Sequence, residues 1–411
     1  MSSTYPRHVA APRARRVTAA VLSLVAMLGS LAAPTSAAAD IEPPPRPLIE
    51  GPVSVDWPAA PEVAAPVHLL VDAVTGQVLS AEGADERRPV ASTVKILTAL
   101  TAAANADLAE EIEIGPEVLD VPGASVELLP GERWTVEELL EGIMVRSGND
   151  AAIALATGVG GDTEGFVELM RRTARQLGLR VGASGVEVTS PSGLDDDQRF
   201  TARDLATLTR VLLADADLRA IVGAEEVALP GREPDENRNL LIGDYPGATG
   251  VKTGYTEASG NSVVASARRD GRELIAIVLG GGPDPERFRD AATLLDHGFE
   301  AFESRELAAE VTLLVAGGTR TILTPRADVV VPARVDVGFE IPIPIRPPDA
   351  GSVPVPVRLG ARQVATVAAE IDPPREAPTG DGAGIGHAVA EGVYAALRAD
   401  HVADSAQADP V

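Results

Sequence analysis

The stretch NSVVASARRDGRELIAIVLGG (Asn261–Gly281) contains two apolar runs separated by the dipeptide Asp270-Gly271. Asp-Gly between two apolar runs is a strong signal for a tight β-hairpin, because such a turn needs two residues with positive φ. The next stretch, PERFRDAATLLDHGFEAF (Pro285–Phe302), has its apolar residues at helical spacing. This part of the sequence therefore predicts an antiparallel strand pair followed by a closing helix.

Upstream of the hairpin, the sequence predicts a layered domain of strands and helices. VHLLVDAVTGQVLSAE gives two strands around a Thr75-Gly76 turn, and GVKTGYT gives another strand just before the hairpin. Helical spacing fills the region between them, in segments that start at Ser92 and Thr135 and at 150–158, 162–177 and 201–214. Thr135 is followed three residues later by Glu138, the spacing of a capping box. We expect an α/β (α+β) catalytic domain over residues 66–304.

The rest of the chain differs from this domain in composition and in hydrophobic pattern. Residues 40–65 are rich in proline and predict a linker, whereas residues 305–372 alternate, are rich in valine and proline, and predict a small β-rich domain. Residues 373–411 predict a second linker and a weakly amphipathic tail, with a thin apolar stripe at helical i, i+4 steps. The stripe carries one arginine and lies among several acids, which disfavours membrane attachment through it.

The first 39 residues resemble an export signal. They contain a basic segment, then the apolar run VTAAVLSLVAMLGSLAA, and then TSAAAD, which offers a small-residue cleavage site after Ala39. Cleavage would remove four arginines and change the net charge from −25 to −29. An uncleaved anchor helix is the alternative. In either case we expect the protein to act outside the cytoplasmic membrane.

Composition excludes several classes of function. The net charge of −25 and the lack of a basic run in the body of the chain argue against nucleic-acid binding. Without cysteine there is no thiol nucleophile, disulfide or thiolate metal site. The five histidines are scattered, which disfavours a metallohydrolase or a Ser-His-Asp hydrolase. We therefore expect neither a metal nor a cofactor.

The chain has 35 lysine and arginine residues in total, and only two of them are lysine. The first lysine stands in STVK, where Ser92 and Lys95 would share one face of a helix, with the serine near the positive end of the helix dipole. A neutral lysine amine can take the proton of a serine hydroxyl, whereas arginine stays protonated. Taken alone, SxxK is a weak signal that occurs by chance in most proteins.

A second polar stretch, VRSGNDAAIALA, lies between two predicted helices. Its glycine allows a tight turn, Ser147 could pass a proton to a leaving amine, and the Asn149 carboxamide could hold a substrate amide. The alternative is that Ser147 or Asn149 simply caps the helix that follows.

The second lysine lies in GVKTGYT, on a predicted strand. Lys252 could bind a carboxylate there or depress the pKa of Lys95, and Gly254 would let a substrate backbone approach closely. The alternative is an edge-strand lysine that faces solvent.

SxxK, SGN and KTG in this order form the motif set of penicillin-binding proteins and class A β-lactamases, with SGN where SDN is frequent. From Pro66 to Phe302 the chain resembles the low-molecular-mass penicillin-binding proteins that act as D-alanyl-D-alanine carboxypeptidases. The resemblance implies a β-lactamase/transpeptidase-like domain with an antiparallel sheet and a helical cluster. It also implies the terminal D-Ala-D-Ala of peptidoglycan stem peptides as substrate, and β-lactam antibiotics as covalent inhibitors.

Roles follow from this resemblance for the matching residues. Ser92 would form the acyl-enzyme, Lys95 would be the general base and Ser147 would relay the proton to the leaving D-alanine. Substrate-binding roles are implied for Asn149, Lys252, Thr253 and Tyr255, with the backbone N–H groups of Ser92 and Tyr255 as the oxyanion hole. Arg287, or else Arg289, matches the family arginine that helps to fix the terminal carboxylate.

Two other functions share these motifs. A class A β-lactamase needs a glutamate with asparagine four residues later, and none of Glu164, Glu168 and Glu187 has one. A catalytically dead wall-binding protein would be expected to lack part of the motif set, which is intact here. The sequence departs from the carboxypeptidases at TSPSGLDD, where an Asn-Pro pair is usual.

Overall fold

The structure is a computed structural model, and it describes residues 57–315, 318–333, 339–340, 351–359, 362–371, 375–376 and 396–397. Side chains are described for residues 57–304 and 329–333. The predicted signal at 1–39, the first part of the linker and most of the tail lie outside the described residues. The domain division proposed from the sequence therefore stays a prediction.

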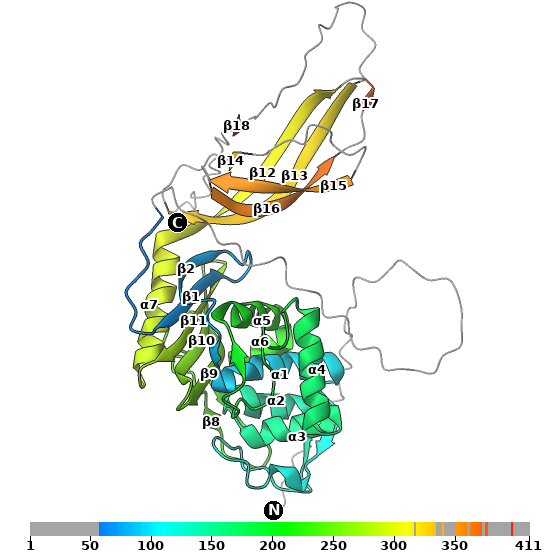
Figure 1. Cartoon of the computed structure of the whole chain (residues 1–411), viewed down its shortest axis with the longest axis vertical. Coiled ribbons are helices and arrows are strands. Elements are labelled where there is room, and N and C mark those ends of the chain that lie inside the picture. The colour runs from blue at the N-terminus through cyan, green and yellow to red at the C-terminus, as the bar shows by residue number, and fades with distance from the viewer. Residues whose placement is uncertain are drawn as a thin grey trace, which may run out of the picture. The chain divides into compact units, whose positions relative to one another are not determined.

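The main sheet has five antiparallel strands in the order β2-β1-β11-β10-β9 (Figure 1). The strands are β1 (Val67–Asp72), β2 (Val78–Glu82), β9 (Ala248–Thr256), β10 (Gly260–Arg269) and β11 (Arg272–Gly281). The predicted hairpin is confirmed, since Arg269 pairs with Arg272 and the two turn residues have φ of 50° (Asp270) and 79° (Gly271). The pairing of β1 with β11 joins the two ends of the domain.

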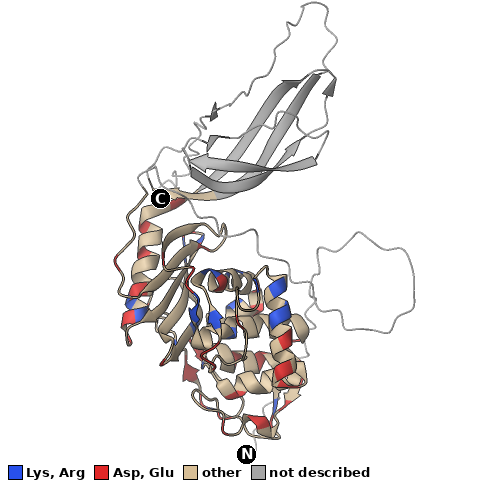
Figure 2. Cartoon of the chain, viewed as in Figure 1, with Lys and Arg blue, Asp and Glu red and all other residues tan. Residues whose placement is uncertain are grey.

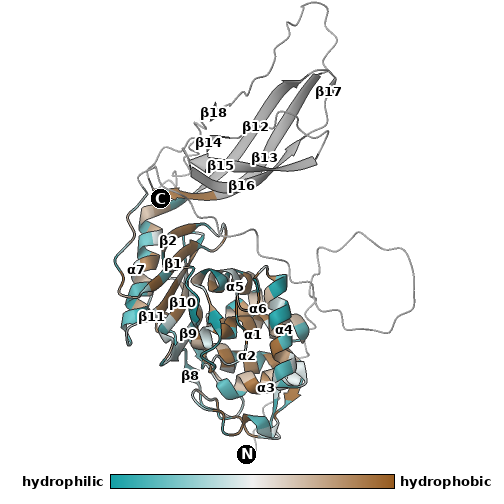
Figure 3. Ribbon diagram, in the orientation of Figure 1, coloured by the Kyte–Doolittle hydropathy of each residue, from teal (hydrophilic) through white to brown (hydrophobic). Residues whose placement is uncertain are grey.

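Both faces of this sheet are buried, and period-two alternation divides its side chains between two cores. On β11, Leu274, Ala276 and Val278 face helix α7 (Glu286–Ala301), whereas the residues between them face the helical cluster. Figure 3 accordingly shows hydrophobic strands between the helices, and Figure 2 shows few charges on them. The sheet is thus sandwiched between α7 and the cluster (Figure 1).

The helical cluster contains the 3₁₀ turn η1 (Ala91–Val94) and six α-helices: α1 (Lys95–Asn105), α2 (Val136–Met144), α3 (Asn149–Gly160), α4 (Thr163–Gln176), α5 (Ala202–Ala214) and α6 (Ala216–Val222). The predicted capping box at Thr135 and Glu138 is present, with both reciprocal hydrogen bonds. The prediction that the first helix starts at Ser92 is wrong in detail. Ala91 has a φ of 47°, residues 91–94 form a 3₁₀ turn, and the α-helix begins at Lys95.

Short strand pairs hold the connecting loops in place. They are β3 (Arg88–Pro89) with β6 (Arg199–Phe200), β4 (Glu111–Glu113) with β5 (Arg133–Thr135), and β7 (Glu226–Val227) with β8 (Asp235–Glu236). A second 3₁₀ turn, η2 (Pro116–Val118), lies between β4 and β5 in the chain.

Residues 57–65, which the sequence assigns to the linker, pack against the catalytic domain. The Trp57 indole donates a hydrogen bond to the Leu79 carbonyl at 3.1 Å. The Asp290 carboxylate on α7 accepts from the backbone N–H groups of Ala64 (3.1 Å) and Ala65 (2.9 Å). The linker prediction is therefore wrong for residues 57–65, which one buried carboxylate and apolar side chains hold against the domain.

The β-rich region contains β12 (Phe302–Val315), β13 (Gly318–Pro332), β14 (Phe339–Glu340), β15 (Gly351–Leu359), β16 (Arg362–Ile371), β17 (Arg375–Glu376) and β18 (Ala396–Leu397). Its sheet has the order β12-β13-β16-β15-β14-β18, and β17 pairs with β13. Residues 396–397 of the tail form a strand beside β14, where the sequence pattern suggested a helix. Within the described part of the chain, no helix is long and apolar enough to cross a membrane.

Candidate active site

The η1 turn presents Ser92 beside strand β9, an edge strand of the main sheet. A Cβ added at Gly254 on β9 would lie 3.0 Å from the Val90 carbonyl oxygen and 3.2 Å from the Thr93 nitrogen. A larger residue at this position would push against the serine-bearing turn, so glycine favours the close approach of the strand. Ser92 itself is half-buried, so its hydroxyl remains accessible.

Lys95 lies one turn after Ser92, and its side chain is fully buried. Its Nζ is 2.9 Å from Ser92 Oγ, 2.6 Å from Asn149 Oδ1 and 2.8 Å from the Ser192 carbonyl oxygen. The contact between serine and lysine expected from the i, i+3 spacing is therefore present. Three separate segments of the chain converge on one amine.

Electrostatics favour the neutral form of this amine. Burial lowers the pKa of Lys95 well below its usual value, and the positive charges of Lys252 and Arg238 lower it further. The carboxylate of Asp150 acts in the opposite direction. Because burial is the largest of these causes, the pKa of Lys95 depends on keeping water away from it.

The SGN stretch ends the turn between α2 and α3. Ser147 takes the left-handed conformation, with φ of 64°, so the serine makes the tight turn that the sequence suggested for Gly148. The N-cap residue of α3 is Gly148, and no side chain caps this helix. Asn149 Nδ2 donates to the Pro122 carbonyl at 2.8 Å, which fixes Oδ1 as the atom that faces Lys95.

Lys252 projects inward from β9 and is 1% exposed, so the alternative of a solvent-facing lysine is wrong. Its Nζ donates to the Thr253 carbonyl at 3.1 Å. Burial, with smaller effects from Arg238 and Arg287, lowers the pKa of Lys252 to about 7. Further along the strand Thr253 is buried, whereas Tyr255 is 60% exposed.

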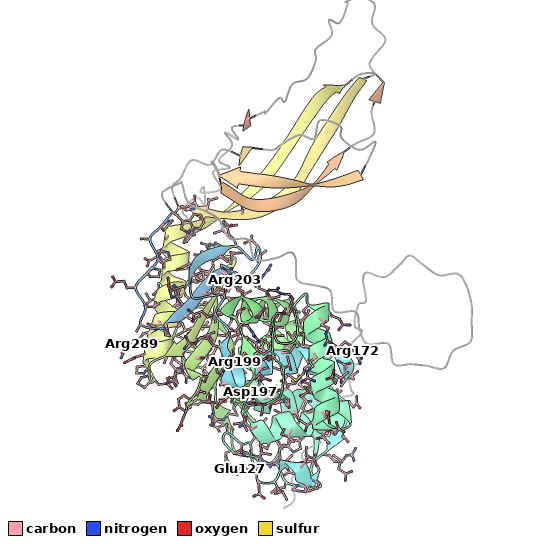
Figure 4. All side chains as sticks on the ribbon, viewed as in Figure 1. Glu127, Arg172, Asp197, Arg199, Arg203 and Arg289 are labelled. Carbon is pink, nitrogen blue, oxygen red and sulfur yellow. The ribbon has the colours of Figure 1, made fainter. Side chains whose placement is uncertain are left out.

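Arg287 on α7 supports the same strand from behind. Its Nη1 donates to the carbonyl oxygens of Gly254 (3.0 Å) and Ser262 (3.2 Å), and its Nη2 donates to Asp284 at 2.9 Å. Arg287 is 7% exposed, and its guanidinium is occupied by these acceptors. This arrangement favours a role in which Arg287 supports strand β9. Arg289, the other match to the family arginine, is exposed on α7 (Figure 4).

Three residues of this site escaped the sequence analysis. The Ser192 carbonyl contacts Lys95 through its backbone, so its side-chain type gave no signal. Arg238 acts on both lysines through its charge, although it lies in a loop without a recognised motif. Asp150 follows directly after SGN, and its carboxylate accepts hydrogen bonds from the backbone of Val126 and Leu128.

An open surface depression of about 590 Å³ lies beside two residues that contact these groups. Its lining includes Pro122 and Ser192, whose carbonyl oxygens accept hydrogen bonds from Asn149 and Lys95 respectively. Leu194 and Ile153 add apolar surface to it.

The fold and the site together define a class of protein. An antiparallel sheet beside a helical cluster, with SxxK at the junction of η1 and α1, SGN between two helices and KTG on the edge strand, is the arrangement typical of penicillin-recognising serine enzymes. Among the described residues, no group of three or more His, Cys, Asp or Glu side chains is arranged to hold a metal ion.

Comparison with known proteins places the chain within this class. A family model described as D-alanyl-D-alanine carboxypeptidase matches residues 54–282, more than half of the 411 residues. The D-alanyl-D-alanine carboxypeptidase DacF of Bacillus subtilis is 32% identical over 249 residues, which cover 58% of this chain and 63% of the relative. DacC of Escherichia coli is 36% identical over 259 residues, which cover 60% of this chain and 64% of the relative. The chain therefore spans less than two thirds of the length of either curated relative.

A solved structure extends the likeness beyond the catalytic domain. The crystal structure of the D-alanyl-D-alanine carboxypeptidase DacD from Francisella tularensis superposes with a TM-score of 0.66 at 25% identity. The superposition covers 78% of this chain and 95% of that chain. The chain belongs to the D-alanyl-D-alanine carboxypeptidase family.

Proposed function

We propose that the protein is a serine-type D-Ala-D-Ala carboxypeptidase that removes the terminal D-alanine from peptidoglycan stem pentapeptides. Ser92 would be acylated, and water would then release the shortened peptide. The observation that carries this proposal is the set of three partners around Lys95 Nζ.

A neutral lysine amine has two N–H bonds and one lone pair. Two of its partners, the Asn149 and Ser192 carbonyl oxygens, can only accept hydrogen bonds and therefore use both N–H bonds. The third partner, the Ser92 hydroxyl, can donate, so the lone pair is left facing its proton. This geometry supports Lys95 as the base that activates Ser92.

The attack would join Ser92 Oγ to the carbonyl carbon between the two D-alanines, while the serine proton passes to Lys95. The backbone N–H groups of Ser92 and Tyr255, on the adjoining turn and strand, would stabilise the oxyanion. When the C–N bond breaks, Ser147 would relay a proton to the departing amine. Hydrolysis of the ester would then restore Ser92.

Recognition of the substrate would rest on strand β9. An edge strand beside the nucleophile can pair with an extended peptide through main-chain hydrogen bonds. Lys252, whose pKa lies at about 7, would gain its proton when the substrate carboxylate binds nearby. Asn149 and Thr253 would hold the peptide, and Arg287 would act on the carboxylate through the strand it supports.

The proposal extends to location and inhibitors. β-Lactams would acylate Ser92 as covalent inhibitors, because they present a strained amide to the same machinery. The protein would act outside the cytoplasmic membrane after cleavage near Ala39, with weak or no attachment through its tail.

Mass spectrometry of a pentapeptide stem before and after incubation tests the activity. Loss of one D-alanine, together with stable labelling by a fluorescent penicillin, is the expected result. Rapid turnover of the penicillin without peptide trimming would indicate a β-lactamase instead. No labelling by a folded protein would indicate a dead site.

A further inference from the structure

The backbone of Thr189–Gly193, called here the Ser192 segment, delivers the carbonyl oxygen that Lys95 contacts. Four points of attachment hold this segment, three of them to η1 or α1 and the fourth to Gln198. At its centre, the Thr98 hydroxyl on α1 donates to the Pro191 carbonyl at 2.7 Å. One residue later, Lys95 on the same helix donates to the Ser192 carbonyl at 2.8 Å.

The end of the segment touches the turn that bears the nucleophile. A Cβ added at Gly193 would lie 2.1 Å from the Ala91 carbonyl oxygen and 2.9 Å from the Ser92 nitrogen. Gly193 also has a φ of +81°, so glycine is needed there for two reasons. With so little clearance, displacement of the segment would alter the surroundings of Ser92 and Lys95 together.

The beginning of the segment is held by Gln198. This side chain is 1% exposed, and its Oε1 accepts hydrogen bonds from the backbone N–H groups of Thr189 (2.9 Å) and Ser190 (3.0 Å). Within the described part of the chain, its Nε2 has no hydrogen-bond partner. The two chain neighbours of Gln198, Asp197 and Arg199, are both labelled in Figure 4 and are more exposed than it. The uncharged carboxamide of Gln198 thus points inward, and among the described residues only its oxygen forms hydrogen bonds.

Ser190 transmits this attachment to the next peptide unit. Its hydroxyl accepts from the Ser192 N–H at 3.1 Å and forms a hydrogen bond with the Ser192 hydroxyl at 2.9 Å. Pro191, between them, has no N–H to donate. Hydrogen bonds therefore connect Gln198 to the backbone of Ser190, and the Ser190 hydroxyl to the Ser192 N–H, one peptide unit before the carbonyl that contacts Lys95.

We propose that Gln198 is a positioning residue for acylation, because its buried oxygen fixes the Ser192 segment and so aims the Ser192 carbonyl at Lys95. The inference rests on the proposed function, in which Lys95 is the base. If the carbonyl moves, one N–H of the neutral amine loses its acceptor. The amine is then free to turn its lone pair away from Ser92.

The charges around Lys95 make a pH profile informative. The groups that act on it are Lys252 from β9, Arg238 from the loop after β8, and Asp150 from α3. A change of Gln198 to leucine alters none of these charges. Any movement of the acidic limb of the rate profile would then report a change in hydration or hydrogen bonding at Lys95 itself.

The test compares variants of the full chain by the rate of labelling with a fluorescent penicillin across pH, beside a thermal melt. Gln198→Leu keeps the volume but removes the acceptor, and we expect at least a tenfold slower labelling. We also expect its acidic limb to move to higher pH, because a loosened segment admits water to Lys95. Gln198→Glu should recover most of the rate at alkaline pH, since a carboxylate oxygen accepts the same two N–H groups.

Gln77→Leu is the matched control. Gln77 is 5% exposed, and its Oε1 accepts a backbone N–H, that of Val330, at 3.1 Å, outside the active site. Its loss should lower the melting temperature without changing the labelling rate or the pH profile. Ser190→Ala, a smaller change at a partly exposed position, should also slow labelling and serves if Gln198→Leu does not fold.

Parental rates and an unchanged profile in a folded Gln198→Leu or Ser190→Ala variant would overturn the inference. Equal slowing by Gln77→Leu would do the same, because it would assign the effect to general destabilisation. A parent protein that is not labelled at all would refute the proposed function, and the inference with it.

Discussion

At the scale of single residues, the two buried lysines are needed in different charge states. Lys95 must lose its proton to act, whereas Lys252 must carry a charge when a carboxylate binds. Lys95→Arg should therefore slow penicillin labelling by about 10⁴-fold, because a guanidinium keeps its proton and general-base help is lost. Lys252→Arg should be milder, since arginine also supplies a cation.

The measurement is the rate of labelling by a fluorescent penicillin in both variants, with a thermal melt to establish folding. Lys95→Arg keeps the charge and most of the length of the side chain, so a purely structural role for the lysine would survive the change. Labelling of a folded Lys95→Arg variant at the parental rate would contradict the mechanism.

Lys252 should also make stability depend on pH. Its pKa is about 7 in the folded protein and about 10.5 in the unfolded chain, so the unfolded chain binds more protons between these values. The free energy of unfolding should therefore rise with pH across this window, and the cost of burying Lys252 should be fully present below pH 7.

Urea titrations of the parent and of Lys252→Met at several pH values between 7 and 10 measure this effect. The variant lacks the titrating group, so its advantage over the parent should shrink as the pH rises. A constant difference between the two proteins over this range would show that Lys252 does not titrate there.

The residues whose side chains carry the chemistry could be recognised in the sequence. Residues that act through the backbone or through a distant charge could not. Lys95 and Lys252 stood out because lysine is rare in this chain and because the motifs fix their spacing. The Ser192 carbonyl is invisible in a sequence, because every residue has one. Arg238 lies among many arginines, and only the three-dimensional structure brings its charge near both lysines.

At the scale of elements, Asp150 joins helix α3 to the segment that precedes β5. Its carboxylate accepts from the Ser125 hydroxyl at 2.6 Å and from the backbone N–H groups of Val126 and Leu128, both at 3.1 Å. Asp150→Ala would remove this acceptor from the buried N–H groups of Val126, Leu128 and Ala151, at a cost of about 1–3 kcal/mol for each group left unpaired. We expect a loss of on the order of 3 kcal/mol in the free energy of unfolding, measured by urea denaturation.

Asp162→Ala provides the comparison for this prediction. Asp162 caps α4 through one exposed hydrogen bond, to the Gly165 N–H, and its loss should cost about 1 kcal/mol. If both variants lost the same small amount of stability, Asp150 would be acting only as a helix cap.

Elements with local signals were predictable, and those fixed by tertiary packing were not. The Asp270-Gly271 hairpin and the capping box at Thr135 depend on neighbouring residues, so the sequence reveals them. The α-helix α1 begins only after a 3₁₀ turn that opens at Ala91, whose φ of 47° no local pattern encodes. The short helix α6 was missed because seven residues give too little periodicity to detect.

At the scale of the whole molecule, the main sheet is assembled from distant parts of the chain. β1 pairs with β11, which lies about 200 residues later, and residues 57–65 attach to α7 through Asp290. Composition alone could not reveal that part of a proline-rich stretch belongs to the catalytic domain. Residues 57–65 are held by the Trp57 indole and by two backbone N–H groups, and the partners of all three lie elsewhere in the chain.

The last prediction concerns the β-rich region. All three motifs lie upstream of it, so a chain that ends at Ser304 should still be acylated by penicillin. The contacts that would be lost include the Gln77–Val330 hydrogen bond, the backbone hydrogen bond from Ala333 to Ala301, and the burial of Val330 in the core that contains Leu70 and Leu79. Val330 and its hydrogen bond alone contribute about 2–4 kcal/mol, so the truncated chain should melt at a lower temperature.

Labelling by a fluorescent penicillin, well below the melting temperature of the truncated chain, measures the outcome. We expect a rate within about twofold of the full chain, because Lys95, Asn149 and Ser192 keep all their mutual contacts within residues 57–304. A truncated chain that folds, as judged by its cooperative melt, but is not labelled would show that the β-rich region contributes to the site.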